Sequence, residues 1–245
     1  MKRADNVPDE KSLIFIPTYN EKENAEKLYF KIASLNIPFD ILFIDDNSPD
    51  GTGISLDNLA KRFNNVKVIH RPGKMGIGSA HKQGIRYAYQ NSYGILITMD
   101  CDFTHSPEYI PRFIGYSQDY DVVLGSRFLS SASLVGWSRW RKFLTLAGHT
   151  LTRILLGFSY DASGAYRLYN LKKIPREAFD SVISEGYSFF FESLYLLNKR
   201  KLNIKEFSIM LPARSSGHSK MDLKAAIKGV SYLFWLWLKN IFRGR

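Results

Sequence analysis

Short apolar runs alternate with longer mixed segments along the first half of the chain. The apolar runs have the length of buried strands, and they lie at Leu13–Ile16, Ile41–Ile44, Val66–Ile69, Ile95–Thr98 and Asp121–Gly125. Pro17 is predicted to stop the first strand, because proline has no backbone N–H. Helical spacing of apolar residues predicts helices at 23–35 and 107–117. It predicts two more helices between them: one runs from the turn after Asn47 to about Phe63, and the other follows Gly78 and runs through Tyr89. Strands that alternate with helices predict an α/β fold, with a mostly parallel sheet covered on both faces.

The second half of the chain continues this pattern less regularly. Its predicted elements are a strand at Tyr166–Tyr169, a helix at Ser188–Leu197 and an edge strand at Ile204–Leu211. The polar tract Arg214–Lys220 lacks apolar anchors, which predicts a mobile lid or acceptor loop. No repeat or low-complexity linker divides the chain. We therefore expect one α/β domain over residues 1–220, followed by an amphipathic helix over 221–245.

Two segments combine an apolar face with flanking cations. Trp137–Leu156 has apolar residues at helical spacing with arginines and a lysine between them, and 221–245 repeats this pattern. The longest apolar stretch of the second segment, Val230–Leu238, is too short to span a bilayer. Aromatic residues beside cations suit a helix that lies in a membrane interface. A helix docked on the domain or on a partner subunit would carry the same pattern, so both interpretations stay open.

The charge balance indicates an anionic partner. The 245 residues include 34 Lys and Arg against 23 Asp and Glu, which gives a formal net charge of +11. Nucleic acid, nucleotide phosphates and a membrane surface all qualify. Acidic residues at the strand ends argue against nucleic acid, because they would repel its phosphate backbone. The single cysteine, Cys101, excludes an internal disulfide, and the polar N-terminus does not resemble a signal peptide, so we expect a reducing compartment.

Two carboxylates directly follow the predicted strand Ile95–Thr98. In open α/β sheets ligands bind at the carboxyl ends of the strands, so Asp100 and Asp102 are expected at the mouth of a site. Hard oxygen ligands suit Mg²⁺ or Mn²⁺, which keep coordination places for substrate phosphates. The alternative is that Asp102 caps the helix near Pro107 and Asp100 is solvated. Cys101 between them is interpreted as a small apolar spacer.

Polar residues also follow the other predicted strands. Asp46 is placed to accept hydrogen bonds from a base or ribose, although Asp45 and Asp46 also suit capping of the turn at Ser48–Gly51. The glycines at Gly73–Gly78 match neither a dinucleotide fingerprint nor a P-loop, and they favour close approach of the backbone to a ligand or a tight turn into the helix. Because carboxyl ends of parallel strands share one edge, these groups are expected to meet there.

Taken together, these motifs resemble those of the family 2 glycosyltransferases, and within that family those of the polyprenyl-phosphate mannose synthases (dolichyl-phosphate mannosyltransferases). The matching segments run in order along nearly the whole chain: Pro17–Glu21, Asp45–Thr52, Gly73–Ala80, Asp100–Asp102, Gly125–Arg127, Gly136–Trp137, Ser163–Arg167, Gly186–Phe189 with Glu192, and Arg214–Lys220. Two positions depart from the usual pattern. Cys101 stands where the family usually has Ala, and Thr104 where relatives often carry Gln or Ser.

The resemblance implies a GT-A fold, a nucleotide-sugar donor, a divalent metal and a lipid-phosphate acceptor. The implied catalytic residues are Asp100, Asp102 and Arg127, and the implied metal ligands are Asp100, Asp102 and Thr104. The implied donor-binding residues are Pro17, Tyr19, Glu21, Asp46, Lys74, Gly76, Asp100, Cys101 and Asp102. The implied acceptor-phosphate residues are Arg127, Arg141, Thr145, Arg214 and Lys220.

The expected activity is inverting transfer of a hexose to a polyprenyl phosphate at the membrane surface. The resemblance favours mannose from GDP-mannose as the donor, Mg²⁺ or Mn²⁺ as the cofactor, and the cytoplasmic side of a membrane as the location. It also allows a small membrane-anchoring subunit as a partner. Two alternatives stay open: transfer of glucose or N-acetylglucosamine from a UDP-sugar, and a catalytically silent nucleotide-sugar-binding scaffold.

Overall fold

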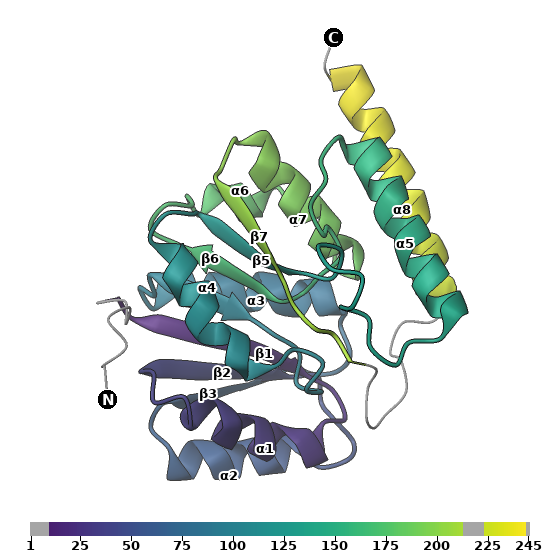
Figure 1. The fold of residues 1–245 in the computed structure, drawn as a ribbon. Coiled ribbons are helices and arrows are strands. Elements are labelled where there is room, and N and C mark those ends of the chain that lie inside the picture. Colours follow the sequence, from purple (N-terminus) through teal and green to yellow (C-terminus); the bar gives the residue numbers. More distant parts are fainter. Residues whose placement is uncertain (1–9, 213–222, 244–245) are drawn as a thin grey trace.

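A seven-stranded sheet organises the molecule, with strand order β3-β2-β1-β4-β6-β5-β7 (Figure 1). This computed structural model describes residues 10–212 and 223–243. The strands are β1 (Ser12–Thr18), β2 (Phe39–Asp45), β3 (Val66–His70), β4 (Ile95–Thr98), β5 (Val122–Ser126), β6 (Arg167–Asn170) and β7 (Ile204–Ser208). Neighbouring strands are parallel except β6, which runs antiparallel to both β4 and β5. The predicted mostly parallel sheet is confirmed.

Helices cover both faces of the sheet (Figure 1). They are α1 (Lys22–Ala33), α2 (Thr52–Arg62), α3 (Ile77–Gln90), the 3₁₀ turn η1 (Pro107–Tyr109), α4 (Ile110–Ser117), α5 (Arg139–Leu156), α6 (Glu177–Asp180), α7 (Ser188–Lys199) and α8 (Leu223–Arg243). Leu13 and Phe15 of β1 join the apolar cluster that contains α3 and α7, whereas Ile14 and Ile16 join that of α1, α2 and α4. Each such side chain stabilises the fold by about 1.5–3 kcal/mol when fully buried.

The prediction that Pro17 ends the first strand is wrong. β1 continues to Thr18, where it still pairs with Asp45 of β2. The Phe15 carbonyl accepts from the Met99 N–H on the β4 side, and Pro17 faces the same side because strand residues alternate. Pairing between β1 and β4 stops at Phe15, so the missing N–H of Pro17 costs no ladder hydrogen bond.

β7 forms one edge of the sheet, as predicted, but it ends at Ser208 rather than at Leu211. Beyond the strand, backbone N–H groups find other acceptors. The Met210 N–H donates to the Tyr109 hydroxyl (2.9 Å) and the Leu211 N–H to the Ser133 carbonyl (2.7 Å). These bonds hold the chain against the domain up to the last described residues before α8.

α5 and α8 lie side by side at one flank of the domain (Figure 1). The inner side of α8 places Leu233 and Leu236 in the core cluster with α3 and α7. Its outer side exposes apolar residues, and α5 does the same. In the described ranges 10–212 and 223–243, no helix is both long and apolar enough to cross a membrane. The predicted division at residue 220 stays a prediction.

His81 of α3 predicts acid sensitivity of the fold. Its ring is enclosed by Phe15, Phe189 and Phe190, with centroids 4.9–5.3 Å away, and neither nitrogen has a hydrogen-bond partner within the described chain. Burial lowers its pKa from 6.5 to about 3, helped by the positive charge of Arg167. The stability that depends on neutral His81 is therefore present above pH 6.5 and is lost as the pH falls toward 3.

The expected loss is up to about 1.4 kcal/mol for each unit of pH in that window. His81→Phe keeps an aromatic ring in the cage and removes the titration, so its stability should fall less on acidification. Urea unfolding of both proteins at about pH 7.5 and about pH 4.5 measures the difference. Identical pH dependence in the two proteins would contradict this assignment.

Candidate functional site

The carboxyl ends of the parallel strands bring the predicted site residues to one edge of the sheet. Two backbone hydrogen bonds continue the ladders past the strand ends: the Asp46 N–H donates to the Thr18 carbonyl (3.0 Å), and the Met99 N–H to the Phe15 carbonyl (3.1 Å). The segments that begin at Asp46 and at Asp100 therefore flank the end of β1. This confirms that the polar residues after separate strands share an edge.

Asp45 and Asp46 have different roles. The Asp45 carboxylate accepts from the Ser48 N–H (3.0 Å), the Ser48 hydroxyl (2.6 Å) and the Thr18 hydroxyl (3.1 Å). Asp50 accepts from the Thr52 N–H (3.0 Å) in a similar way. Asp45 and Asp50 therefore cap the turn that leads into α2, which leaves Asp46 as the carboxylate available to a ligand.

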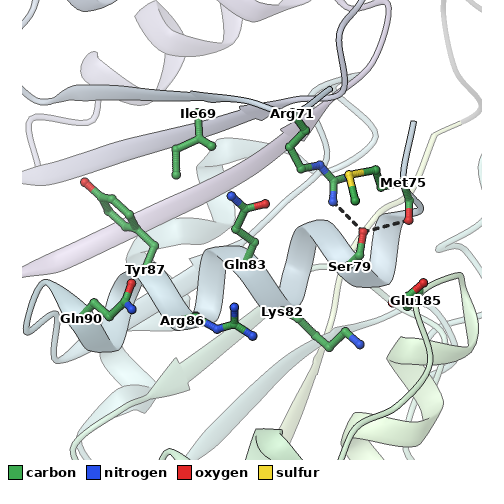
Figure 2. Close-up of a pocket in the computed structure, with 10 residues that line it drawn as sticks. All are labelled: Ile69, Arg71, Met75, Ser79, Lys82, Gln83, Arg86, Tyr87, Gln90 and Glu185. Carbon is green, nitrogen blue, oxygen red and sulfur yellow. Dashed lines mark hydrogen bonds between the residues drawn. The ribbon is translucent and has the colours of Figure 1, made fainter. Parts of the chain in front are cut away.

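Asp46 forms a buried ion pair with Arg71 at the end of β3. Burial raises the pKa of Asp46, and the hydrogen bonds and charge of Arg71 oppose that shift. Arg71 also donates to the Ser79 hydroxyl (2.6 Å), as Figure 2 shows, and to the Gly76 carbonyl (3.2 Å), and these bonds fix its guanidinium. The Asp46 carboxylate, a hydrogen-bond acceptor, and the Arg71 guanidinium, a hydrogen-bond donor, are therefore held side by side and shielded from solvent.

A groove of about 530 Å³ runs along α3 beside the end of β3 (Figure 2). Arg71 lines it together with Lys82 and Arg86, so it is positively charged. The described residues that line it do not include Asp100 or Asp102. The groove therefore adjoins the sheet edge through Arg71 without being the place where the carboxylate pair lies.

Lys74 and Tyr19, which are both predicted to bind the nucleotide-sugar donor, are in contact with each other. The Lys74 ammonium lies 4.9 Å from the centroid of the Tyr19 ring, which is the geometry of a cation–π contact. Glu21 is nearly buried, its N–H donates to the Thr52 hydroxyl (2.9 Å), and its carboxylate accepts from the Asn24 amide (2.8 Å). Pro17 lies in β1 itself. These residues border the same strand ends as Asp46.

Gly76 and Gly78 are required by packing against the first turn of α7 and the residues just before it. Gly76 has φ +95°, and a Cβ there would lie 2.5 Å from the Glu185 carbonyl oxygen. A Cβ on Gly78 would lie 2.6 Å from the Phe189 Cβ. The sequence predicted close approach of the backbone to a ligand, or a tight turn, at these glycines, whereas the approaching group in this structure is another part of the chain.

The aspartates after β4 are held by local hydrogen bonds. Asp102 accepts from the Thr104 N–H (3.1 Å) and the Thr104 hydroxyl (2.6 Å) in one tight turn. The 3₁₀ turn that follows is capped by Ser106 and not by Asp102. The Asp100 N–H donates to Nδ1 of His105 (2.9 Å), so a neutral His105 carries its proton on Nε2.

This arrangement fits a divalent cation that is coordinated mainly by its substrate. The Asp100 side chain is 33% exposed at the edge, while Cys101 is buried in the core, as expected of an apolar spacer. Within the described ranges, no group of three or more His, Cys, Asp or Glu side chains is placed to hold a metal alone. Mg²⁺ and Mn²⁺ typically take one or two carboxylates and complete their shell with phosphates and water.

Arg127, after β5, is fixed by Asp161. Its Nε and Nη2 donate to the two Asp161 oxygens (2.8 and 2.6 Å), and Nη2 also donates to the Ser163 hydroxyl (2.6 Å). Burial alone would lower the pKa of Arg127, but Asp161 and then Asp100 raise it above its ordinary value. Arg127 thus stays cationic.

The predicted acceptor residues are only partly described. Arg141 lies in the first turn of α5 with its guanidinium 3.7 Å from the centroid of the Trp137 ring. Thr145 follows one helical turn later on the same helix, and its side chain is half-buried. Arg214 and Lys220 lie outside the described residues.

Residues 13–176 match the sequence profile described as "Glycosyl transferase family 2". The chain belongs to this family. It is 34% identical over 211 residues to undecaprenyl-phosphate mannosyltransferase of Micrococcus luteus, covering 86% of this chain and 87% of that protein. It is 32% identical over 218 residues to polyprenol monophosphomannose synthase of Mycolicibacterium smegmatis, covering 88% and 82%.

Solved structures of two other synthases share the fold of this glycosyltransferase. One is glucosyl-3-phosphoglycerate synthase from Mycobacterium tuberculosis in complex with Mn²⁺, UDP-glucose and phosphoglyceric acid, with TM-score 0.67, 17% identity and coverage of 94% and 80%. The other is mannosyl-3-phosphoglycerate synthase from Rubrobacter xylanophilus, with TM-score 0.64, 17% identity and coverage of 96% and 74%. These similarities confirm the predicted GT-A fold.

Sequence reasoning missed Arg71, Asp161 and His105 as parts of the site. Arg71 directly follows the predicted strand Val66–Ile69, and a cation at the same sheet edge as Asp46 was a signal that the assignment of donor-binding residues did not use. Asp161 had no such signal, because its partner Arg127 lies 34 positions earlier in the chain. His105 lies close to the aspartates, and a polar ring three residues after Asp102 was a signal that was not used.

Proposed function

We propose that this glycosyltransferase transfers mannose from a nucleotide-sugar donor to the phosphate of a polyprenyl lipid. The observation that carries the proposal is the arrangement of two opposite charges at one sheet edge: the carboxylates follow β4, Arg127 follows β5, and these two strands run in the same direction on either side of β6. A metal bound by the carboxylates and an acceptor phosphate bound by Arg127 would meet there. The assignment of mannose and of a polyprenyl acceptor is supported by the names of the two relatives.

On the donor side, Asp46 and Arg71 are proposed to bind the base. A guanine or uracil edge presents an N–H beside a carbonyl, which matches a carboxylate beside a guanidinium. Lys74, held over Tyr19, is proposed to reach the diphosphate. Glu21 and the backbone at Pro17, Gly76 and Cys101 would shape the walls of the donor pocket. GDP-mannose is the preferred donor in this proposal, although the same pair of groups would accept UDP.

Asp100 and Asp102 are proposed to hold Mg²⁺ or Mn²⁺, with Thr104 fixing the orientation of Asp102. When bound, the metal would act as a Lewis acid on the diphosphate that leaves. Thr104 was predicted as a metal ligand, and its hydroxyl donates to Asp102 in this structure. Its proposed role is accordingly to orient the ligand.

On the acceptor side, no catalytic base is needed. A phosphate monoester has its second pKa near about 6, so it is largely ionised near neutral pH and is already a nucleophile. It requires cations that position it and exclude water. We assign this role to Arg127, Arg141, Arg214 and Lys220, with the Thr145 hydroxyl as a further donor. Direct attack of the phosphate on an α-linked donor inverts the anomeric carbon.

The lipid acceptor is proposed to be reached through the exposed faces of α5 and α8. Trp140 and Phe143 stack on each other at 5.6 Å and are 67% and 59% exposed, and Phe242 of α8 is 74% exposed. Aromatic residues among cations suit the interface of an anionic membrane. We place the enzyme on the cytoplasmic side of that membrane. A small anchoring subunit on the same faces is the alternative occupant.

The double substitution Trp140→Ser, Phe143→Ser is expected to reduce binding to anionic vesicles about tenfold or more, because it removes exposed aromatic area from the interface. Transfer to a long-chain prenyl phosphate should fall with it. Transfer to a short, water-soluble prenyl phosphate should stay within about twofold. Vesicle co-sedimentation and parallel transfer assays measure both effects.

Ile54→Ser is the matched control, because Ile54 is 71% exposed on α2, away from α5 and α8. Substitution is preferable to deletion of α8, since Leu233 and Leu236 belong to the core and deletion would disturb the fold. Equal losses on long and short acceptors would contradict a role in membrane binding.

The proposed function as a whole is tested with the purified full chain, a short prenyl phosphate, Mn²⁺ or Mg²⁺, and a panel of nucleotide sugars. Mannosyl transfer from GDP-mannose is the expected result. Transfer from UDP-glucose or UDP-N-acetylglucosamine instead would assign the alternative donor. Donor binding without transfer from any sugar would favour the silent scaffold and contradict the proposal.

A further inference from the structure

The segment 181–187, between α6 and α7, is held in place from the interior of the domain. It forms neither helix nor strand, so no regular ladder of backbone hydrogen bonds fixes it. Glu192, in the second turn of α7, is 3% exposed, and its two carboxylate oxygens accept from the N–H groups of Ile183 (3.1 Å) and Ser184 (2.9 Å). The Ser184 hydroxyl donates to the same carboxylate. Glu192 therefore fixes the backbone of this segment.

The segment 181–187 caps the start of α3. The first N–H groups of a helix have no partner within the helix, and Gly76, at the N-cap position, has no side chain that could accept from them. The Ser79 N–H donates instead to the Glu185 carbonyl (3.0 Å). Gly76 and Gly78 permit this approach, because a Cβ on either would lie within 3 Å of the segment. The first turn of α3 is therefore held by a backbone that Glu192 fixes.

The first turn of α3 in turn holds Arg71. The Arg71 guanidinium donates to the Ser79 hydroxyl (2.6 Å) and the Gly76 carbonyl (3.2 Å), and it forms the buried ion pair with Asp46. Figure 2 shows Ser79 between Arg71 and the Met75 carbonyl at the start of the helix. The guanidinium that is proposed to bind the base is thus oriented by the turn that the Glu185 carbonyl caps.

We propose that Glu192 is a positioning residue for recognition of the donor base. It holds the segment that caps α3, and the capped turn holds Arg71 beside Asp46. This inference rests on the proposed function in taking Asp46 and Arg71 as the groups that bind the base. It deepens that function, because it extends base recognition to a buried carboxylate of α7, on a different part of the chain.

The test compares the binding of GDP and of pyrophosphate to the full chain, by titration calorimetry with Mn²⁺ present. The two ligands share a diphosphate, and only GDP has a base. Glu192→Gln keeps the size of the side chain, but its amide nitrogen cannot accept from a backbone N–H. GDP affinity should therefore fall about tenfold, while pyrophosphate affinity should stay within about twofold. UDP replaces GDP if the transfer assay assigns a uridine donor.

A merely structural role of Glu192 predicts a different result, because general damage to the fold would weaken both ligands alike. Equal losses for GDP and pyrophosphate would overturn the inference, and so would unchanged GDP affinity in folded Glu192→Gln. Asp40→Asn is the matched control. The Asp40 carboxylate accepts from the Tyr93 hydroxyl (2.6 Å) near the beginning of β2, whereas Asp46 follows the end of that strand. This control should lower stability without changing GDP affinity.

Asp46→Asn provides a second comparison. In that background the contact with the base is already weakened, so adding Glu192→Gln should change GDP affinity by less than about twofold. A further loss as large as that in the wild type would show that Glu192 acts independently of Asp46, and it would overturn the inference.

Because replacing a buried carboxylate can prevent folding, Ser184→Ala serves as a milder variant. It removes the hydroxyl donor and leaves both backbone N–H bonds to Glu192, so GDP affinity should fall about twofold to threefold with pyrophosphate affinity unchanged. Unchanged GDP affinity in this variant would count against the inference.

Wild-type binding and transfer are measured in parallel. Absence of binding of both GDP and UDP refutes the proposed function, and this inference with it. Normal wild-type binding and transfer, with the same GDP affinity in Glu192→Gln and Ser184→Ala, refutes this inference alone.

Discussion

Asp102→Asn is expected to reduce glycosyl transfer by about 10²–10³-fold or more while leaving the fold intact. Asparagine has the same size, and its amide oxygen can still accept from the Thr104 N–H and hydroxyl, so the turn after β4 is preserved. The change removes one negative charge from the proposed metal site. Turnover with saturating donor, acceptor and Mn²⁺ is the measurement, with thermal unfolding as the check on the fold.

Two comparisons make this prediction sharp. Asp45→Asn alters a carboxylate at the end of β2 that caps a turn, so it should affect stability more than the metal requirement. Asp102→Asn should weaken Mn²⁺ binding measured directly, and excess Mn²⁺ should restore part of the activity. Near wild-type turnover of Asp102→Asn, with metal still strictly required, would remove Asp102 from the metal site.

Arg127→Ala is expected to lower kcat/KM for the prenyl phosphate by about 10²–10³-fold, because a charge-assisted contact to the acceptor phosphate is lost. Donor binding should change little, since Asp46, Arg71 and Lys74 are untouched. The structure adds a second effect. Removal of Arg127 leaves Asp161 buried without its partner, which is expected to cost about 3–5 kcal/mol of stability.

The two effects can be separated. Arg127→Ala combined with Asp161→Asn removes both charges and should recover most of the stability without recovering use of the acceptor. Arg214→Ala, at the other arginine assigned to the acceptor, should raise the KM for the prenyl phosphate in the same direction. If donor affinity collapsed in these variants while the acceptor KM stayed constant, the arginines would belong to the donor site.

The strands and their functional ends could be predicted because both signals are contiguous in sequence. An apolar run that ends in Asp100 shows its burial and its chemistry within a few residues, and the parallel arrangement then gathers such ends at one edge. The end of β1 was predicted wrongly for the opposite reason. A proline breaks a strand only where its missing N–H would have paired with a neighbouring strand. The backbone nitrogen of Pro17 faces β4, and β4 stops pairing with β1 at Phe15, so the outcome depended on a contact between distant segments.

Contacts between distant segments could not be predicted. Asp45 and Asp46 are indistinguishable as residue types, and their roles are decided by Ser48 on one side and Arg71 on the other. Asp161 reaches Arg127 only because β6 enters the sheet antiparallel between β4 and β5. This placement of β6 cannot be predicted from the residues around Asp161, so nothing in the local sequence marks Asp161 as a residue of the site.

The contact of Gly76 and Gly78 with the segment before α7 has a consequence for how this enzyme can diverge in evolution. The two glycines are constrained by Glu185 and Phe189. A substitution at either glycine would require a compensating shift in that distant segment. Homologues that differ in one of these segments should therefore differ in both.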